Sequence, residues 1–306
     1  MSKPIVTLAT CADFPNLDED DRALPQALYE RGIEPRIAVW NDPSVDWSKA
    51  GVVVMRSVRD YARKRNYANF LRWARSLERP LNHAEIVNWF GDKHYLKDLA
   101  ARGVPIIPTT WLEPSVNLSK HQVHTRFPAH GDFVIKPAIS SGGRGTGRYT
   151  ATSATSRSAA INDTMHHLAR GRTVMMQRYL ESVDQTGELS LVYFNGVLSH
   201  AVQKKPMLHP RFKAVDEVHE EIVEAREPSE MEWLWGERVR RALHAQIKER
   251  AGRDIQVLFN RVDVVSDGAG GFYLMEVSLV DAPLYLNAAE GALENFADAI
   301  AQRVFW

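Results

Sequence analysis

The sequence predicts an α/β domain with a largely parallel sheet, followed by an α+β region. Strand and helix signals alternate over residues 1–90, which is typical of a parallel sheet. A glycine-rich loop between two strand signals marks the middle of the chain, and an Asn-Gly hairpin opens its last third. A chain of 306 residues has room for about two average domains.

The composition excludes several classes of protein. The 38 Lys and Arg residues balance the 38 Asp and Glu residues, so no long-range positive field attracts nucleic acid or a membrane surface. The single cysteine, Cys11, forms no internal disulfide, and we therefore expect a cytoplasmic protein. No segment approaches 18 uninterrupted apolar residues, which argues against a membrane-spanning helix.

The N-terminal elements follow from apolar runs and the residues that interrupt them. Short apolar runs predict three strands, and helical spacing predicts two helices, the first opened by acidic residues and stopped by Gly32. The predicted strands are 5–9, 36–40 and 51–55, and the predicted helices are 18–32 and 61–77.

The middle of the chain reads as a compact α+β unit. A short helix at 92–103 ends at Gly103 and leads into a strand bounded by prolines. The predicted order after that helix is strand 104–111, strand 133–137, loop 140–147, strand 148–150, helix 158–170 and strand 173–180.

The last third opens with a hairpin around Asn195-Gly196, the strongest short turn signal. Residues 203–230 combine charges and prolines without clear periodicity, which predicts a mobile loop. The other predicted elements are strands 189–194 and 197–202, helix 232–250, strands 255–265 and 272–279, and a C-terminal helix that buries Leu293, Phe296, Ala297 and Ile300.

The loop at 140–147 is the first candidate for chemistry. Its four glycines within six residues leave backbone N–H groups free to face a polyphosphate. It lacks the Gly-Lys-Ser/Thr of a Walker A loop, and the strand signal at 148–150 argues against a dinucleotide fingerprint. A merely flexible hairpin loop is the alternative.

Lysines near this loop strengthen the case for an anion site. Lys136 lies in an otherwise apolar strand four residues before the loop, where an inward lysine needs an anion to offset its desolvation. A surface lysine on an edge strand is the alternative. Lys204 and Lys205 leave a later strand and could reach a γ-phosphate, although such a pair is more often solvated.

Two acidic strands near the C-terminus form the third candidate. Arg261 and Asp263 share one face of a strand, and Glu276 and Ser278 share one face of the next. If these strands pair, the two carboxylates converge, and hard oxygen ligands near phosphate suit Mg²⁺. A solvated polar face on a hairpin is the alternative.

Six elements in this order resemble the ATP-grasp superfamily, in the branch of glutathione synthetase and the glutamate ligases that modify ribosomal proteins. The resemblance covers about residues 90–306 and implies an ATP-grasp fold behind a parallel-sheet substrate domain. The domains expected from it are 1–90 for substrate, 91–180 for the lid and 181–306 for the metal site. The matching elements are Asp92-Lys93, Phe133-Val-Ile-Lys136-Pro137, loop 140–147, Met175-Met-Gln177-Arg-Tyr-Leu-Glu181, Arg261-Val-Asp263 and Met275-Glu276-Val-Ser278.

The resemblance implies ATP-binding roles for these residues. The phosphates are contacted by Lys93 and Lys136 and covered by the loop of Ser141, Gly142, Gly143 and Gly145. The adenine pairs with the backbone at Gln177, Arg178, Tyr179 and Leu180, and the ribose is held by Glu188, or else by Glu181 or Asp184.

The resemblance also implies a metal site and an oxyanion site. Asp263 and Glu276 bind two Mg²⁺ ions, for which Mn²⁺ can substitute, and Arg261 stabilises the developing oxyanion. Ser278 stands where the family usually has Asn, so Asp281 or water completes the metal shell.

Four runs give a narrower resemblance, to the subfamily of O-ureido-D-serine cyclo-ligases: 56–61, 92–105, 190–202 and the proline-bearing stretch after Glu276. This resemblance implies that ATP phosphorylates a substrate carboxylate and that an amine then attacks the acyl phosphate, closing a ring. Arg56, Asp60 and Tyr61 are then candidates for binding the amino-acid-like substrate. A surface cluster on a basic helix is the alternative.

Two other functions remain open at this point. One is an intermolecular ligase of amino acids or dipeptides, and the other is a non-catalytic nucleotide-binding regulator, which only Ser278 favours. A nicotinamide oxidoreductase is excluded because no Gly-x-Gly-x-x-Gly turn follows the first strand. The expected partners are a small amino-acid-like substrate and further copies of the chain, as a dimer or tetramer.

Overall fold

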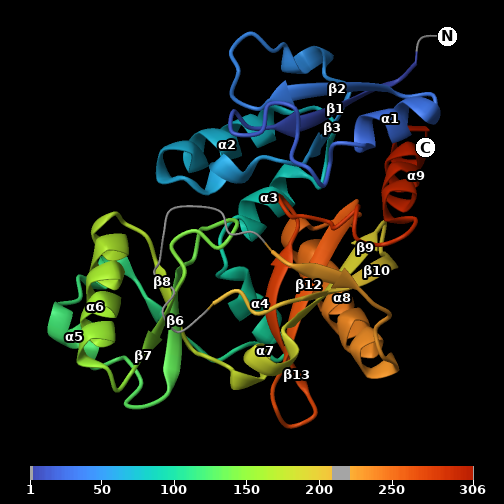
Figure 1. Cartoon of the computed structure of the whole chain (residues 1–306). Coiled ribbons are helices and arrows are strands. Elements are labelled where there is room, and N and C mark those ends of the chain that lie inside the picture. The colour runs from blue at the N-terminus through green and yellow to red at the C-terminus, as the bar shows by residue number, and fades with distance from the viewer. Residues whose placement is uncertain (1–2, 209–220, 306) are drawn as a thin grey trace.

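The computed structural model of this protein describes residues 3–208 and 221–305. Three β-sheets form its frame: one in the N-terminal domain, one in the lid and one in the C-terminal part (Figure 1). No helix within these described ranges has both the length and the apolar character needed to cross a membrane.

The N-terminal sheet is parallel, as predicted. Its strand order is β2-β1-β3-β4, with every neighbouring pair parallel. The elements are β1 (Ile5–Thr10), α1 (Leu24–Glu30), β2 (Glu34–Val39), β3 (Val52–Met55), α2 (Lys64–Ser76), β4 (Pro80–Leu81) and α3 (Ala84–Phe90). The helix α3, between β4 and the lid, was not predicted.

Both predicted N-terminal helices start later than expected. Residues 18–23 form turns, because their carboxylates are used in tertiary contacts. Asp18 forms an ion pair with Arg59, and Asp21 forms one with Arg56 at 2.8 Å. The acidic stretch that suggested a helix start therefore forms ion pairs within the N-terminal domain.

The lid is an antiparallel sheet of order β5-β8-β6-β7 with helices on one face (Figure 1). Its elements are β5 (Thr109–Leu112), α5 (Lys120–His124), β6 (Asp132–Pro137), β7 (Gly147–Thr150), α6 (Ala154–Ala169) and β8 (Val174–Arg178). The helix α4 (Tyr95–Ala101) precedes the lid. The helix predicted at 158–170 starts earlier, because Ser153 caps it by accepting the N–H of Ser156.

The C-terminal sheet has the order β11-β10-β9-β12-β13 and contains the predicted hairpin. Its elements are α7 (Glu181–Thr186), β9 (Glu188–Phe194), β10 (Val197–Lys204), β11 (Val223–Ala225), α8 (Glu230–Ala251), β12 (Phe259–Ser266), β13 (Phe272–Ser278) and α9 (Ala292–Phe305). The prediction of a loop throughout 203–230 is wrong at β11, which pairs with β10. Residues 209–220 of that loop lie outside the described residues.

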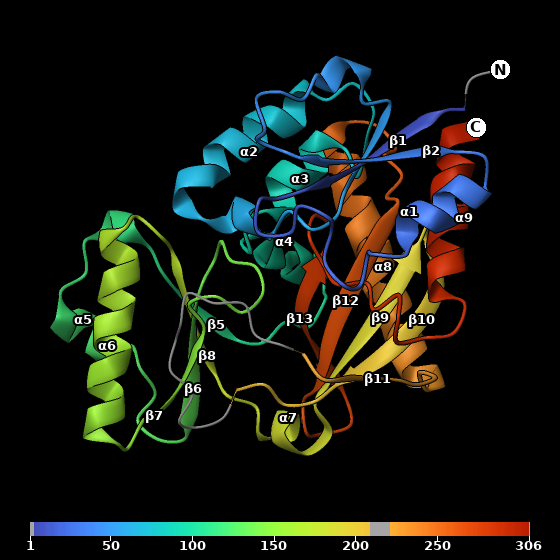
Figure 2. The same ribbon diagram turned by 45° about the horizontal axis from the view of Figure 1, so that its top comes forward.

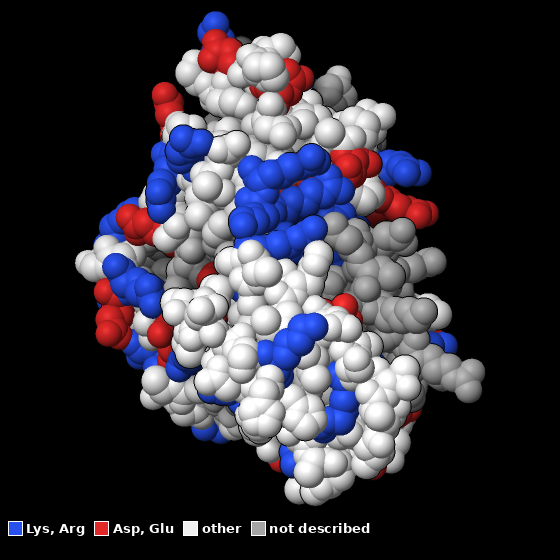
Figure 3. Space-filling model, turned by 90° about the vertical axis from the view of Figure 1, so that its left-hand side faces the viewer, with Lys and Arg blue, Asp and Glu red and all other residues white. Residues whose placement is uncertain are grey.

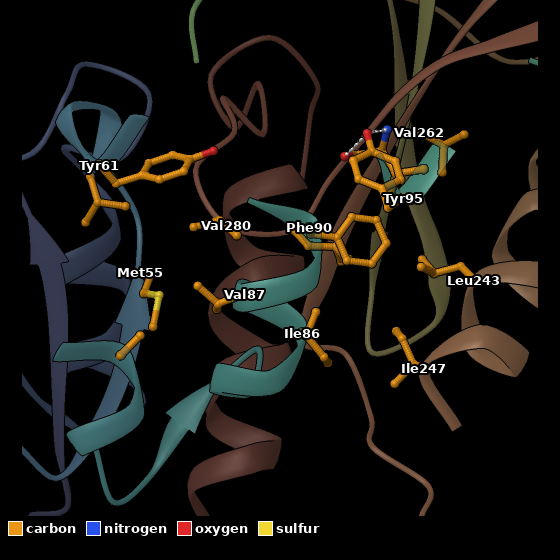
Figure 4. Close-up of a cluster of buried hydrophobic side chains, with 14 of the residues drawn as sticks. Met55, Tyr61, Ile86, Val87, Phe90, Tyr95, Leu243, Ile247, Val262 and Val280 are labelled. Atoms are coloured by element: carbon orange, nitrogen blue, oxygen red, sulfur yellow. Dashed lines mark hydrogen bonds between the residues drawn. The ribbon is translucent and has the colours of Figure 1, made fainter. Parts of the chain in front are cut away.

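The N-terminal domain and the C-terminal sheet share their hydrophobic cores. One cluster runs from Met55 and Tyr61 through Phe90 of α3 to Ile247 of α8 (Figure 4). A second joins β1 and α1 to α9, which explains why the last helix stands beside the first domain (Figure 2). The lid has a core of its own, which includes Phe133. Met175 of β8 nevertheless packs in the first cluster, so the lid is joined to the rest at this strand.

Candidate active site

A cleft of about 590 Å³ lies where the three parts of the molecule meet. Its walls come from the lid sheet and glycine loop, from β9, β12 and β13 of the C-terminal sheet, and from the turns after β1 and β3. Most residues singled out from the sequence line it. Those that do not are Arg56, Asp60, Gly145, Glu181, Asp184 and Lys205.

Lys136 reaches this cleft because side chains alternate along β6. Phe133 and Ile135 pack into the lid core, so Val134 and Lys136 face the opposite way, into the cleft. Lys136 is 8% exposed, and its ammonium has no hydrogen bond or ion pair to any of the described residues. Burial lowers the pKa of Lys136 to about 8. A buried cation without a partner is typical of a site that binds an anion.

Lys93 also lines the cleft and contacts the glycine loop. Its backbone N–H donates to the carbonyl of Ala138 at 3.0 Å, which fixes the start of the segment leading to α4. Its ammonium donates to the carbonyl and hydroxyl of Ser140 at 3.1 and 3.2 Å, and lies 3.2 Å from Glu276. Lys93 thus joins the loop to the carboxylate of β13.

The glycine loop needs its glycines for backbone conformation. Gly142, Gly143 and Gly145 all have positive φ, between 61° and 71°. Gly142 and Gly143 line the cleft, whereas Gly145 packs on α6, where a Cβ would lie 3.0 Å from the ring of His167. The loop presents its backbone to the cleft, as the sequence predicted.

The strands β12 and β13 pair so that Asp263 lies directly opposite Glu276. Ser278 lies opposite Arg261 in the same register. Asp263 accepts two hydrogen bonds from Arg261, at 2.9 and 2.7 Å, and one from Ser190 at 2.6 Å. Burial opposes its charge, but Arg261 and Lys204 outweigh burial and lower the pKa of Asp263 to about 2.

Lys204, at the end of β10, is enclosed by carboxylates. Its ammonium lies 2.8 Å from Glu188, 3.4 Å from Asp263 and 3.8 Å from Glu221. Burial opposes its charge, but these carboxylates raise the pKa of Lys204 well above its ordinary value. Lys204 therefore carries its charge in the cleft with partners already in place.

An apolar slot follows β8, where an adenine ring is expected. Gln177, Arg178, Tyr179 and Leu180 line this end of the cleft, and the Gln177 side chain donates to Thr109 at 2.8 Å. Sequence analysis missed the walls of the slot, which are Ile107, Val134, Val183 and Met275. Alternation along β13 would place Met275 on the face opposite Glu276, but a β-bulge at this point of the β12–β13 pair interrupts the alternation. Nothing local indicated Ile107.

The three ribose candidates have different surroundings. Glu188 lines the cleft and pairs with Lys204. Asp184, on α7, accepts hydrogen bonds from Arg148 at 3.0 Å and from the hydroxyl of Tyr179 at 2.5 Å. Glu181 opens α7 and does not line the cleft. The geometry thus favours Glu188.

The substrate candidates are buried, so they do not form a surface cluster on a basic helix. Tyr61 lines the cleft. Arg56 instead pairs with Asp21, and Asp60 accepts the indole N–H of Trp40 at 2.8 Å. The arginine of this segment that lines the cleft is Arg59, which sequence analysis missed.

The donors at β12 and β13 fit Mg²⁺ held jointly with phosphate. Within the described residues, no group of three or more His, Cys, Asp and Glu side chains forms a metal cage. Mg²⁺ commonly uses one or two carboxylates together with phosphate oxygens, which matches Asp263 and Glu276. Asp281, which was expected to complete the metal shell, instead contacts Ser141 and Arg59.

A face of the molecule beside the lid carries a dense group of Lys and Arg side chains, although the whole chain has no net charge (Figure 3). The chain therefore has a local concentration of positive charge although its net charge is zero. Such a concentration favours the approach of an anionic ligand from that side.

Comparison with known proteins gives consistent results. Residues 6–88 match the family described as the N-terminal domain of D-cycloserine synthetase DcsG. The cycloserine biosynthesis protein DcsG of Streptomyces lavendulae is 32% identical over 303 residues, which cover 98% of this chain and 99% of that protein.

Solved structures resemble this one over nearly the whole chain. The crystal structure of D-cycloserine synthetase DcsG superposes with a TM-score of 0.85 at 31% identity, covering 98% of this chain and 99% of that one. The D-alanine–D-alanine ligase of Bacillus anthracis, complexed with ATP, gives a TM-score of 0.63 at 15% identity, with 98% of each chain covered. That second likeness concerns the fold, and it confirms the predicted ATP-grasp architecture. On the near full-length identity with DcsG, this chain belongs to the D-cycloserine synthetase family of ATP-grasp ligases.

Proposed function

We propose that this protein is an ATP- and Mg²⁺-dependent ligase that closes a ring in a small amino-acid derivative, O-ureido-D-serine or a close analogue. The unpartnered, buried Lys136 carries this proposal, because it faces the same cleft as the glycine loop and the paired carboxylates. The cycloserine name of the 32% identical relative supports the substrate class.

The residues of the cleft divide the work of phosphoryl transfer. Lys136 and Lys93 bind phosphate oxygens, and the backbone of Gly142 and Gly143 covers them. Glu188 holds the ribose. Asp263, Glu276 and the hydroxyl of Ser278 would hold Mg²⁺, which when bound would supply neutralisation of charge on the transferred phosphoryl group.

The reaction requires positioning and charge more than a strong base. ATP phosphorylates the substrate carboxylate, ADP leaves, and the tethered nitrogen attacks the acyl phosphate, forming the C–N bond and releasing phosphate. Arg261 is held in place by Asp263 and by the carbonyl of Pro283 at 2.9 Å, so it can stabilise the oxyanion without rearranging. The tether supplies the effective concentration that a second bound substrate would otherwise provide.

A single assay tests this function. Purified protein with ATP, MgCl₂ and O-ureido-D-serine alone should release ADP and phosphate and yield a ring-closed product by mass spectrometry. If turnover occurs only after a separate amino acid or peptide is added, the protein is an intermolecular ligase. If nucleotide binds without turnover on any such substrate, the protein is a nucleotide-binding regulator.

We further propose a cytoplasmic homo-oligomer, a dimer or a tetramer. Cys11 is a free thiol and is buried, as in proteins of reducing compartments. Met231, Trp233 and Leu234 are exposed at the start of α8, an apolar group that suits a subunit contact. Light scattering coupled to gel filtration tests the oligomeric state.

A further inference from the structure

The two ends of the cleft differ in their charged groups. The phosphate end holds Lys93, Lys136, Lys204 and Arg261 together with the carboxylates of Glu188, Asp263 and Glu276. The end formed by the turns after β1 and β3 and by the segment after β13 holds Asp18, Glu19, Asp20 and Asp281, with Arg59 as its cation. This second end therefore has an excess of carboxylates, which suits the ammonium group of an amino acid.

Three of these four carboxylates are already satisfied. Asp18 is paired with Arg59. Asp20 accepts the backbone N–H groups of Leu284, Tyr285 and Leu286 at 2.8, 2.9 and 2.6 Å, which fixes the segment after β13. Glu19 is exposed to solvent. The fourth carboxylate, Asp281, is the one whose charge is least compensated.

Asp281 is buried in the wall of the cleft, with 2% of its side chain exposed. Its Oδ2 accepts the hydroxyl of Ser141 at 2.8 Å. Among the described residues, Oδ1 receives no hydrogen bond, and its nearest cation is Nε of Arg59 at 4.0 Å. Burial raises the pKa of Asp281 to about 6, against the opposing effects of Arg59 and Ser141. The one nearby cation does not outweigh burial, so the carboxylate can accept a further positive group.

Asp281 is also adjacent to the phosphate end. Ser141, its hydrogen-bond partner, belongs to the glycine loop that lines the cleft beside Lys93 and Lys136. The two charged groups of an amino acid are separated by a single carbon, so they require binding groups this close together. The hydroxyl of Ser141 further ties the loop to the same carboxylate.

We propose that Asp281 binds the α-ammonium group of the amino-acid substrate. This inference rests on the proposed ligase function and adds to it the group that distinguishes an amino acid from a simple carboxylic acid. Tyr61 and Arg59 line the same subsite. Ser141 donates to Oδ2, so Oδ1 is available for the ammonium, and the amide oxygen of the Asp281→Asn variant can still accept from Ser141.

The test compares two substrates that differ only in the amine: O-ureido-D-serine and its des-amino analogue, 3-(ureidooxy)propionate. The wild-type protein should prefer the amino substrate by about 100-fold in kcat/KM, the scale of a hydrogen-bonded charge pair. Asp281→Asn should abolish most of this preference by lowering kcat/KM for the amino substrate alone. KM for ATP should stay within about twofold, and the des-amino analogue should react as before.

Glu19→Gln is the matched control, because it removes a negative charge from the same end of the cleft at an exposed position. It should leave the preference unchanged. Ser141→Ala should keep the preference, because the carboxylate remains, while lowering kcat for both substrates.

Several outcomes would overturn the subsite. One is an unchanged preference in Asp281→Asn; another is an equal loss on both substrates with a raised Mg²⁺ requirement, which would make Asp281 a metal ligand. Should Asp281→Asn fail to fold, the wild-type protein still decides, since equal use of both substrates contradicts the subsite. Absence of wild-type turnover with either compound would instead refute the proposed function.

Discussion

Lys136 of the lid and Lys204 of the C-terminal sheet are both buried lysines on β-strands that face one cleft. Lys136 has no partner among the described residues, and burial lowers its pKa to about 8. Lys204 is surrounded by three carboxylates within 3.8 Å, which outweigh burial and raise its pKa. The difference indicates that Lys136 is reserved for a ligand, whereas Lys204 also holds the protein together.

The largest effect is expected from Lys136→Met. Turnover should fall by about 100- to 1000-fold, because a preorganised charge that meets the phosphates is lost. The melting temperature should not fall, since the variant removes an uncompensated buried charge and keeps the side-chain volume. Steady-state kinetics and thermal melting measure both, with the exposed Lys120→Met of α5 as the control. Near-normal turnover would remove Lys136 from the site.

Lys204→Met should show the opposite pattern in stability. It leaves Glu188, Asp263 and Glu221 without a shared cation, which we expect to cost about 3 kcal/mol of unfolding free energy. Urea denaturation measures the change. The neighbouring Lys205 is exposed and pairs with the exposed Glu224, so Lys205→Met should change stability by less than about 0.5 kcal/mol. Equal stability of the two variants would contradict the comparison.

Removal of the paired carboxylates should weaken metal binding, and Asp263→Asn should also destabilise the fold, because Asp263 is the buried partner of Arg261. Asp263→Asn and Glu276→Gln should each raise the Mg²⁺ concentration needed for half-maximal rate, by about tenfold or more. Ser278→Asn should be tolerated or should tighten metal binding, because the amide offers a longer oxygen ligand. Loss of activity in a folded Ser278→Asn variant would reveal a substrate role for the serine.

The lowered pKa of Lys136 also predicts a pH dependence. The free protein loses this proton near pH 8 and the unfolded chain near 10.5, so the penalty for burying the charge is fully present below pH 8 and is lost progressively as the pH rises from 8 to 10.5. Nucleotide binding needs the charged form, so ATP affinity should fall by about tenfold between pH 7 and 9. Calorimetry at both pH values measures it. Lys136→Met should remove this dependence, and a dependence that survives would contradict its assignment to Lys136.

Local signals predicted much of the fold. Three of the four strands of the parallel sheet, the hairpin at Asn195-Gly196 and the glycine loop follow from patterns within ten residues, where apolar runs and turn residues act. The register of Asp263 with Glu276 was also predicted, because it depends only on two neighbouring strands and their turn.

Contacts between distant segments escaped prediction. The acidic residues at 18–21 looked like a helix start, but they bind Arg59, Arg56 and the backbone at 284–286. Arg59 itself was overlooked in favour of Arg56, because only the short helix at Arg59–Ala62 decides which arginine faces the cleft. The alternation of residues along a strand predicts which face of the sheet a side chain lies on. It does not predict which residue that side chain contacts there.

The sequence by itself determined the residue types of the site: the glycines that allow positive φ, the lysine in an apolar strand, and the carboxylates on adjacent strands. Tertiary structure decided which charges are neutralised. In the sequence, Lys136 and Lys204 are both lysines near strand ends. Only the packing of the three sheets leaves Lys136 without an ion-pair partner in the described part of the chain and places carboxylates around Lys204. The physical reason is that the free energy of a buried charge depends on every partner within a few ångströms, and those partners come from distant parts of the chain.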